Sequence, residues 1–141
     1  MNTPDSKITA FLKKHHVLTL ATVSGIQPWV ANCFYAFIEE QMVFVFTSGF
    51  ETRHIQEVSS NNKVAGNVVL ETSIVGKIQG VQFSGNLQLA ENEVLATAEK
   101  AYLKRFPFAA LMDTTLWILQ IDYLKMTDNR LGFGKKLIWE R

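Results

Sequence analysis

The chain has 141 residues, of which 48 % are hydrophobic and 19 % are charged. This length fits one domain, residues 1–141, and this composition is too apolar for a disordered chain. The 14 basic and 13 acidic residues leave a net charge of +1, which excludes the strong positive charge typical of nucleic-acid-binding proteins. The longest apolar runs fall far short of the about 20 residues that span a bilayer.

The single cysteine, Cys33, excludes a disulfide within the chain and is typical of a reducing compartment. It lies between apolar neighbours in a predicted strand, where a buried and unreactive thiol is expected more often than a nucleophile. The sequence has no zinc-ligand spacing, nucleotide-binding loop or hydrolase motif, and no signal-peptide pattern opens it. We therefore expect a cytoplasmic domain with no metal site, no membrane partner and no nucleic-acid partner.

Helical spacing of apolar residues comes first along the chain, and strand spacing follows it. The pattern predicts helices over residues 3–16, with Thr3 as N-cap, and over 92–106, which Pro107 ends. It also predicts a helix over residues 48–60, where Ser48 and Glu51 have capping-box spacing and Thr52 is a second possible cap. Period-two spacing predicts strands over residues 17–24, 28–38, 42–47, 63–70, 74–91 and 117–127. Residues 128–141 are polar, basic and glycine-containing, which favours a solvated tail.

The strand predicted over residues 28–38 is apolar on both faces, and Asn32 alone interrupts the second face. One face can fill a barrel interior, so the other needs a helix, a ligand or a second subunit to cover it. Short turns between the first three strands indicate an antiparallel meander. Six such strands in this length fit a small closed β-barrel, a mainly β fold.

A candidate phosphate site lies at residues 47–54, where a strand ends and a short helix begins. Free backbone N–H groups at a helix start favour an anion, and Thr47, Ser48 and Thr52 add hydroxyl groups. The Arg53 guanidinium can contact two phosphate oxygens, and His54 adds a donor when protonated. The alternative interpretation is an ordinary helix cap with Arg53 in solvent.

The adjacent strand offers an apolar wall with an isolated polar group at Asn32, which suits a flat aromatic cofactor. Gln82, on the strand predicted over residues 74–91, adds a second polar contact. Plain barrel core explains the same pattern, so both interpretations stay open at this point.

A series of short motifs resembles the flavin-binding split-barrel family related to pyridoxamine 5′-phosphate oxidase. The motifs are VLTLAT at 17–22, PWV at 28–30, VFVFTS at 43–48, TRH at 52–54, NKVA at 62–65 and VQFSG at 81–85. They follow the family's order and spacing over about residues 8–130. The chain is most similar to a small bacterial subfamily of unassigned function, which shares TRH, GVQFSG and the terminal TDNRLGFGKKLIW.

The resemblance implies a six-stranded antiparallel Greek-key split barrel that forms a homodimer, with flavin mononucleotide (FMN) in clefts at the dimer interface. It implies that Arg53 binds the phosphate and that His54 replaces a second basic anchor. The cofactor-binding positions that it implies are Asn32, Cys33, Phe34, Phe46, Thr47, Ser48, Thr52, Arg53, His54 and Gln82, with Asn129 and Lys135 contributed by the other subunit. The second strand lacks the basic residues that the oxidase itself carries there.

The resemblance therefore implies an FMN-dependent oxidoreductase that acts on an unknown small molecule, and we assign no catalytic acid or base to the protein. Pyridoxamine phosphate oxidation is not expected, because the oxidase's substrate-phosphate residues near its C-terminus have no counterpart here. Two alternatives remain. One is a non-catalytic binding or sensor module that holds haem, a deazaflavin or no cofactor. The other is an interaction protein whose cleft is filled by Trp29, Phe34, Trp117 or Trp139.

Overall fold

The computed structural model describes residues 2–112 and 115–141. The helices are α1 (Ser6–Lys14), α2 (Arg53–Ser60) and α3 (Asn92–Arg105), and short 3-10 turns occur at η1 (Val75–Lys77), η2 (Pro107–Leu111) and η3 (Asn129–Leu131). The strands are β1 (Val17–Ser24), β2 (Gln27–Ile38), β3 (Val43–Thr47), β4 (Lys63–Val69), β5 (Gln79–Leu89), β6 (Leu116–Asp128) and β7 (Lys136–Glu140). The mainly β prediction is confirmed.

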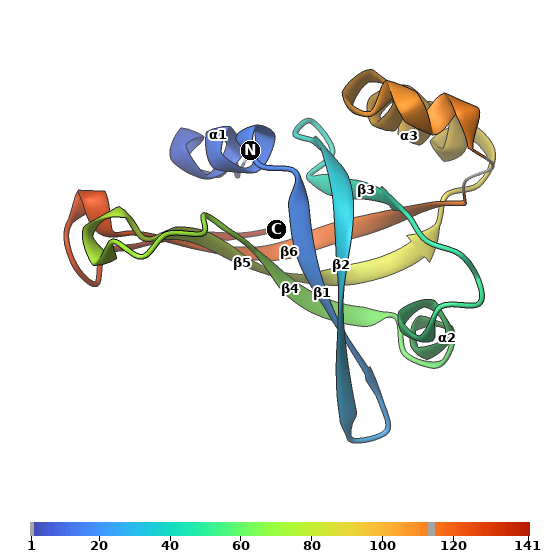
Figure 1. Cartoon of the computed structure of the whole chain (residues 1–141), viewed down its shortest axis with the longest axis horizontal. Coiled ribbons are helices and arrows are strands. Elements are labelled where there is room, and N and C mark those ends of the chain that lie inside the picture. Colours follow the sequence, from blue (N-terminus) through green and yellow to red (C-terminus); the bar gives the residue numbers. More distant parts are fainter. Residues whose placement is uncertain (1, 113–114) are drawn as a thin grey trace.

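The strands form one antiparallel sheet in the order β3-β2-β1-β4-β5-β6-β7. An additional pairing of β3 with β6 closes the first six strands into a barrel. Because β4 returns beside β1 after the β1–β2–β3 meander, the connectivity is a Greek key. The three helices lie outside the sheet, with α1 and α3 near one side and α2 at the start of β4 (Figure 1).

The seventh strand corrects the prediction of six strands and of a solvated tail. Strand β7 pairs with β6, which places Leu124 opposite Trp139 and Met126 opposite Leu137. Trp139 is only 5 % exposed and joins the main core. Leu137 and Trp139 alternate with exposed neighbours, as in a strand. The strand is short because the glycine-containing turn comes directly before it.

Helix starts also differ from the predictions. Helix α1 begins after Asp5, not Thr3, because the Asp5 carboxylate accepts a hydrogen bond from the Lys7 backbone N–H. Helix α2 begins after Thr52, so the capping-box prediction at Ser48 is wrong. The intervening segment is a turn, closed by a hydrogen bond from the Thr52 backbone N–H to the Gly49 carbonyl. Strand β5 starts at Gln79 and not at residue 74, because residues 75–77 form η1.

The main core fills the barrel interior, with Tyr35, Phe44 and Phe46 among its fully buried side chains. A second cluster packs α3 against β2, β3 and β6. It covers Ala36 at the end of β2, whereas Val30 and Phe34 on the same face of β2 stay 60 % exposed. The second apolar face of β2 is thus covered by a helix at one end only.

A bulge in β6 at Asp122 lies opposite the glycine that interrupts the apolar face of β5. The β5–β6 register shifts between Ser84 and Gly85. A Cβ atom at Gly85 would lie 2.2 Å from the Gln120 backbone oxygen, so the close approach of β6 requires glycine there.

Candidate functional site

The corner between β3 and α2 holds the predicted phosphate-site residues in a hydrogen-bonded turn. The Ser48 Oγ and the His54 Nε2 are 2.7 Å apart, and the Ser48 carbonyl accepts a hydrogen bond of 2.9 Å from the Trp117 indole. The Thr52 hydroxyl donates to the Gly49 carbonyl at 2.9 Å. These contacts tie the corner to β6 and fix where α2 begins.

Two titratable groups at this corner stay neutral at neutral pH. Burial lowers the pKa of His54, and the nearby Glu57 carboxylate opposes that effect. Burial raises the pKa of the Cys33 thiol to about 11, against a weaker opposing hydrogen bond with Ser48. The expectation of a buried and unreactive thiol therefore agrees with its surroundings.

Arg53 contacts Glu57 and Trp29 directly, and Thr22 holds Glu57 in turn. Its Nε donates to the Glu57 Oε2 at 2.9 Å, one helical turn further along α2. Its guanidinium carbon lies 4.0 Å from the centre of the Trp29 ring on β2. The Thr22 hydroxyl on β1 donates to the other Glu57 oxygen at 2.8 Å. Hydrogen bonds from Arg53 and Thr22 lower the pKa of Glu57, so its carboxyl is ionised at neutral pH.

The Nη groups of Arg53 have no hydrogen-bond partner within residues 2–112 and 115–141. The side chain is 49 % exposed, so these two groups are open to solvent and to a ligand. An Arg guanidinium with both Nη groups free can contact two oxygens of one phosphate.

A row of polar side chains crosses the outer sheet face, by which we mean the side of β2, β1, β4, β5 and β6 that carries Asn32. Strand pairing places five residues side by side in this polar row: Asn32, Thr19, Asn67, Gln82 and Lys125. The Thr19 hydroxyl donates to the Asn32 side-chain carbonyl at 3.0 Å. Amide groups in such a row offer both hydrogen-bond donors and acceptors.

Apolar side chains flank the polar row. Phe34 lies opposite Val17 on one side of it, and Val30 lies opposite Ala21 on the other. Val17, Val30 and Phe34 are all exposed. The Phe34 and Phe106 rings meet edge to face with centres 5.7 Å apart. The outer sheet face is therefore an exposed, partly apolar surface with a hydrogen-bonding row across it.

The structure brings most of the predicted site residues into two neighbouring groups. Thr47, Ser48, Thr52, Arg53 and His54 form the corner, with Cys33 buried beside Ser48. Asn32, Phe34 and Gln82 lie on the outer sheet face. Strand β2 carries Asn32 on the outer sheet face and, on its opposite face, Trp29, whose ring lies against Arg53.

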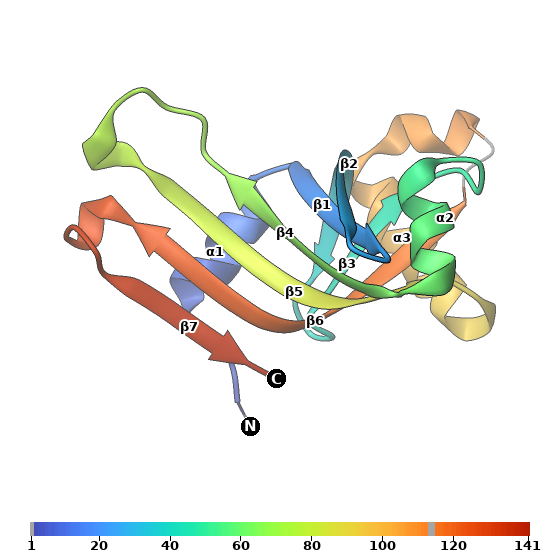
Figure 2. The same ribbon diagram turned by 90° about the horizontal axis from the view of Figure 1, so that it is seen from below.

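Three predicted site residues lie elsewhere in the chain. The Phe46 side chain is fully buried in the barrel interior. Asn129 donates from its side chain to the Val75 carbonyl at 2.8 Å, and Lys135 lies exposed in the β6–β7 turn. This turn and the β4–β5 connection form the end of the molecule opposite α2 (Figure 2). Asn129 and Lys135 thus do not join Arg53 within one chain.

Sequence reasoning missed Glu57, Thr22 and Asn67, and assigned Trp29 no part in anion binding. Arg53 and Glu57 stand four residues apart on a predicted helix, which is a recognisable ion-pair spacing. No sequence signal links Thr22 or Trp29 to that pair, because their contacts cross between elements. The 3.5 Å contact between the hydroxyl groups of Thr47 and Tyr102 was missed for the same reason.

The fold and site define a mainly β protein with an exposed sheet face and an ion-paired arginine at the corner between β3 and α2. The pyridoxamine 5′-phosphate oxidase family profile matches residues 4–127, so the chain belongs to this family. A UPF0306 protein of Yersinia pseudotuberculosis is 41 % identical over 143 residues, covering 100 % of this chain and 97 % of the relative.

Two solved structures share the fold at low sequence identity. A haem-binding protein from Mycobacterium smegmatis matches with a TM-score of 0.78 and 18 % identity, over 99 % of this chain and 60 % of that protein. An FAD-binding protein from Mesorhizobium loti matches with a TM-score of 0.71 and 14 % identity, over 89 % of this chain and 95 % of that protein. Within the described part of the chain, every helix is too short or too polar to cross a membrane.

Proposed function

We propose that the protein binds FMN, with Arg53 as the phosphate anchor, and acts as a flavin-dependent oxidoreductase on a small molecule. The observation that carries this proposal is the Arg53 guanidinium, which is oriented by Glu57 and Trp29 while both Nη groups stay free of the described residues. A phosphate monoester offers the paired oxygens that such a guanidinium recognises. The solved structures that share the fold include a haem-binding and an FAD-binding protein, so the choice of ligand rests on this anion site.

The outer sheet face fits the ring of the same ligand. Its exposed apolar side chains suit a flat aromatic system, and the amides of Asn32, Asn67 and Gln82 suit the donors and acceptors of a flavin pyrimidine edge. When bound, the flavin supplies hydride and electron transfer, and the protein residues bind and orient it. The nicotinamide cofactor or small substrate that reduces it would enter from solvent.

A homodimer completes the proposed site. Val17, Val30 and Phe34 leave an apolar surface on the outer sheet face that a second copy would cover. Asn129 and Lys135, at the far end of one chain, are then available to the cleft of the partner. We expect a dimer by size-exclusion chromatography with light scattering, and a monomer at all concentrations would contradict this arrangement.

Flavin titration tests the proposal directly. Adding purified protein to FMN should quench the flavin fluorescence with saturation, and Arg53→Ala should weaken binding by about tenfold or more, because a charged hydrogen-bond pair is lost. Riboflavin, which lacks the phosphate, is the matched ligand: its affinity should be unaffected by the same substitution. Absence of saturation at tens of micromolar FMN would overturn the proposal.

A second candidate function is haem binding, which an exposed histidine favours. His16 is exposed next to the outer sheet face, and its ring centre lies 6.3 Å from that of Phe106. An imidazole beside an apolar aromatic surface suits axial ligation of a haem. Adding haemin should then give a shifted Soret band that His16→Ala removes, whereas flavin binding predicts no such dependence on His16. A deazaflavin would be recognised by its own absorption in the purified protein.

A further inference from the structure

The Arg53 side chain is fixed from two directions by residues outside the predicted phosphate motif. Glu57 holds the Nε at 2.9 Å, and the Trp29 indole lies against the guanidinium with 4.0 Å between the guanidinium carbon and the ring centre. Trp29 and Thr22 are direct partners across β1 and β2. The cluster of Arg53, Glu57, Trp29 and Thr22 thus joins α2 to the β1–β2 hairpin.

This arrangement differs from an ordinary surface ion pair in how much freedom its members retain. Exposed pairs contribute little because two long, mobile side chains must be ordered at once. Here the Glu57 side chain is only 9 % exposed, and the fully buried Thr22 holds its second oxygen. The carboxylate is therefore already fixed, and the contact with the indole ring limits the movement of the guanidinium.

The orientation decides which edge of the guanidinium a ligand can reach. Because Nε faces Glu57, the edge formed by the two Nη groups faces away from it. The nearby carboxylate also offsets the positive charge of Arg53, so recognition of an anion here depends on hydrogen-bond direction as well as on charge. Ordering before binding reduces the entropy lost when the ligand is bound.

We propose that Glu57 and Trp29 are positioning residues that hold Arg53 with its Nη edge open for the ligand phosphate, an inference that rests on the FMN-binding function proposed above. Neither residue contacts the phosphate itself. Their effect should therefore appear in the preference for FMN over riboflavin, measured as the ratio of the two dissociation constants, and should be absent from riboflavin binding.

The experiment measures this preference for wild type, Arg53→Ala, Trp29→Leu, Trp29→Tyr and Glu57→Gln by fluorescence titration. Trp29→Leu should lower the preference about fivefold, the size of an exposed cation–π interaction. Trp29→Tyr keeps a flat ring and should restore most of it. Glu57→Gln should lower it about tenfold, because the charge-assisted bond to Nε is lost. In the Arg53→Ala background neither substitution should change the preference further.

Two controls separate positioning from general damage. Lys13→Ala removes an exposed cation of α1 that pairs with Glu39, and it should leave the preference unchanged. Thermal unfolding checks that each variant is folded. Trp29 is partly exposed, so its variants test the proposal even where Glu57→Gln is unstable.

The outcomes distinguish this inference from the proposed function. A preference that stays constant in Trp29→Leu, or that falls equally in Trp29→Tyr, overturns the positioning role while FMN binding stands. A preference that rises in Glu57→Gln shows that Glu57 only neutralises Arg53, which also overturns it. Equal wild-type affinity for FMN and riboflavin removes Arg53 as the anchor and overturns it too. Failure of wild type to bind either flavin overturns the proposed function together with this inference.

Discussion

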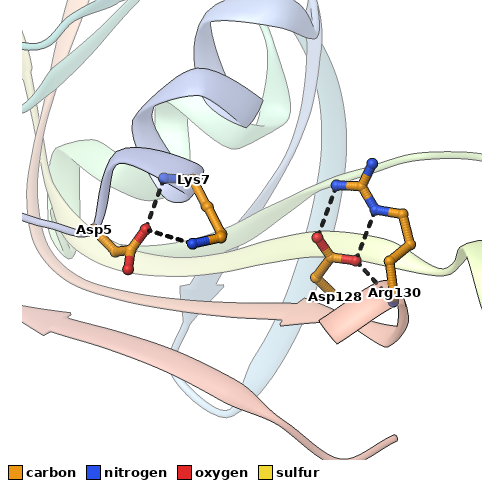
Figure 3. A network of polar contacts seen from close by, with 4 residues as sticks. All are labelled: Asp5, Lys7, Asp128 and Arg130. Atoms are coloured by element: carbon orange, nitrogen blue, oxygen red, sulfur yellow. Dashed lines mark hydrogen bonds and ion pairs between the residues drawn. The ribbon is translucent and has the colours of Figure 1, made fainter. Parts of the chain in front are cut away.

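Two arginine–carboxylate pairs at opposite ends of the molecule show how the same chemical groups serve different purposes. Arg130 contacts Asp128 with two nitrogens, Nε to Oδ1 at 3.0 Å and Nη2 to Oδ2 at 2.8 Å, near the Asp5–Lys7 pair of α1 (Figure 3). Arg53 contacts Glu57 with Nε alone. In the Arg130 pair, Nε and one Nη of the guanidinium bind the carboxylate of the same chain. In the Arg53 pair, only Nε binds a carboxylate, and neither Nη has a hydrogen-bond partner among the described residues.

The carboxylates differ less than the arginines. Asp128 is only 1 % exposed and accepts a further hydrogen bond from the Arg130 backbone N–H at 3.0 Å, so this pair closes the turn after β6. Glu57 is also buried, but its second oxygen is bound to Thr22. The comparison teaches that the free edge of the guanidinium, and not the presence of an ion pair, identifies an anion site.

The largest expected change in the free energy of unfolding comes from the Arg130–Asp128 pair. Asp128→Asn replaces a carboxylate that accepts hydrogen bonds from the Arg130 Nε, Nη2 and backbone N–H by an amide whose NH2 group faces the guanidinium. We expect the free energy of unfolding to fall by about 1–3 kcal/mol, the cost of disrupting buried hydrogen bonds to a charged group. Urea unfolding measures this change, with Lys13→Ala as a matched surface variant. An unchanged unfolding midpoint would mean that the Arg130 pair is only a solvated surface contact.

A substitution in the Arg53–Glu57 pair should change ligand affinity more than it changes the free energy of unfolding. Arg53→Lys keeps a cation but removes the planar fork and its stacking on Trp29. We expect FMN affinity to fall about fivefold, or about 1 kcal/mol, with riboflavin affinity unchanged. Isothermal titration with both ligands checks this. If the Arg53→Lys variant bound FMN as tightly as wild type, charge alone would define the site and the comparison of the two forks would fail.

The smallest expected effect is on the pH dependence of stability, which differs between the His54 corner and the Asp128 end of the molecule. Burial lowers the pKa of His54 from 6.5, so the unfolded chain takes up this proton more readily than the folded chain. The contribution of neutral His54 to the free energy of unfolding is therefore fully present above pH 6.5 and is lost as the pH falls below that value. The pKa values of Glu57 and Asp128 are lowered from 4.5 and 3.8, so their contributions are lost only at lower pH.

Urea unfolding of wild type and His54→Gln between about pH 6.5 and about pH 4.5 tests this assignment. The variant should show a shallower loss of stability across that window. Burial also lowers the pKa of His15, which remains in both proteins, so the difference between the two slopes isolates His54. Parallel slopes would show that His54 titrates as a solvated histidine.

Much of the fold was predictable because it depends on local periodicity. Period-two alternation of apolar residues along residues 81–89 indicates β5, and the glycine that interrupts it lies where β6 approaches closely. Strand β7 was missed, because a five-residue strand after a glycine-rich turn shows too little alternation to be recognised. Barrel closure was inferred from strand number, apolar faces and the family resemblance, because the β3–β6 pairing that closes the barrel has no local sequence signal.

The candidate site was predictable to a similar degree. Residues 47–54 combine a strand end, hydroxyl groups and an arginine, all recognisable along the chain. The polar row was predicted only in part: the sequence analysis identified Asn32 and Gln82 but not Asn67. Register across three strands places Asn67 between Thr19 and Gln82, and register depends on partners distant in sequence.

The sequence by itself determined the element types, the barrel class and the anion-favouring corner, because these follow from residue spacing and from side-chain chemistry. Only the tertiary structure decided which part of the outer face of β2 is covered. It also decided which of the two arginines has Nη groups without a partner among the described residues. The physical reason is that burial and hydrogen-bond pairing act through space. Thr22, Trp29 and Glu57 come from three separate elements, and their contacts with one another and with Arg53 exist only once the barrel has formed.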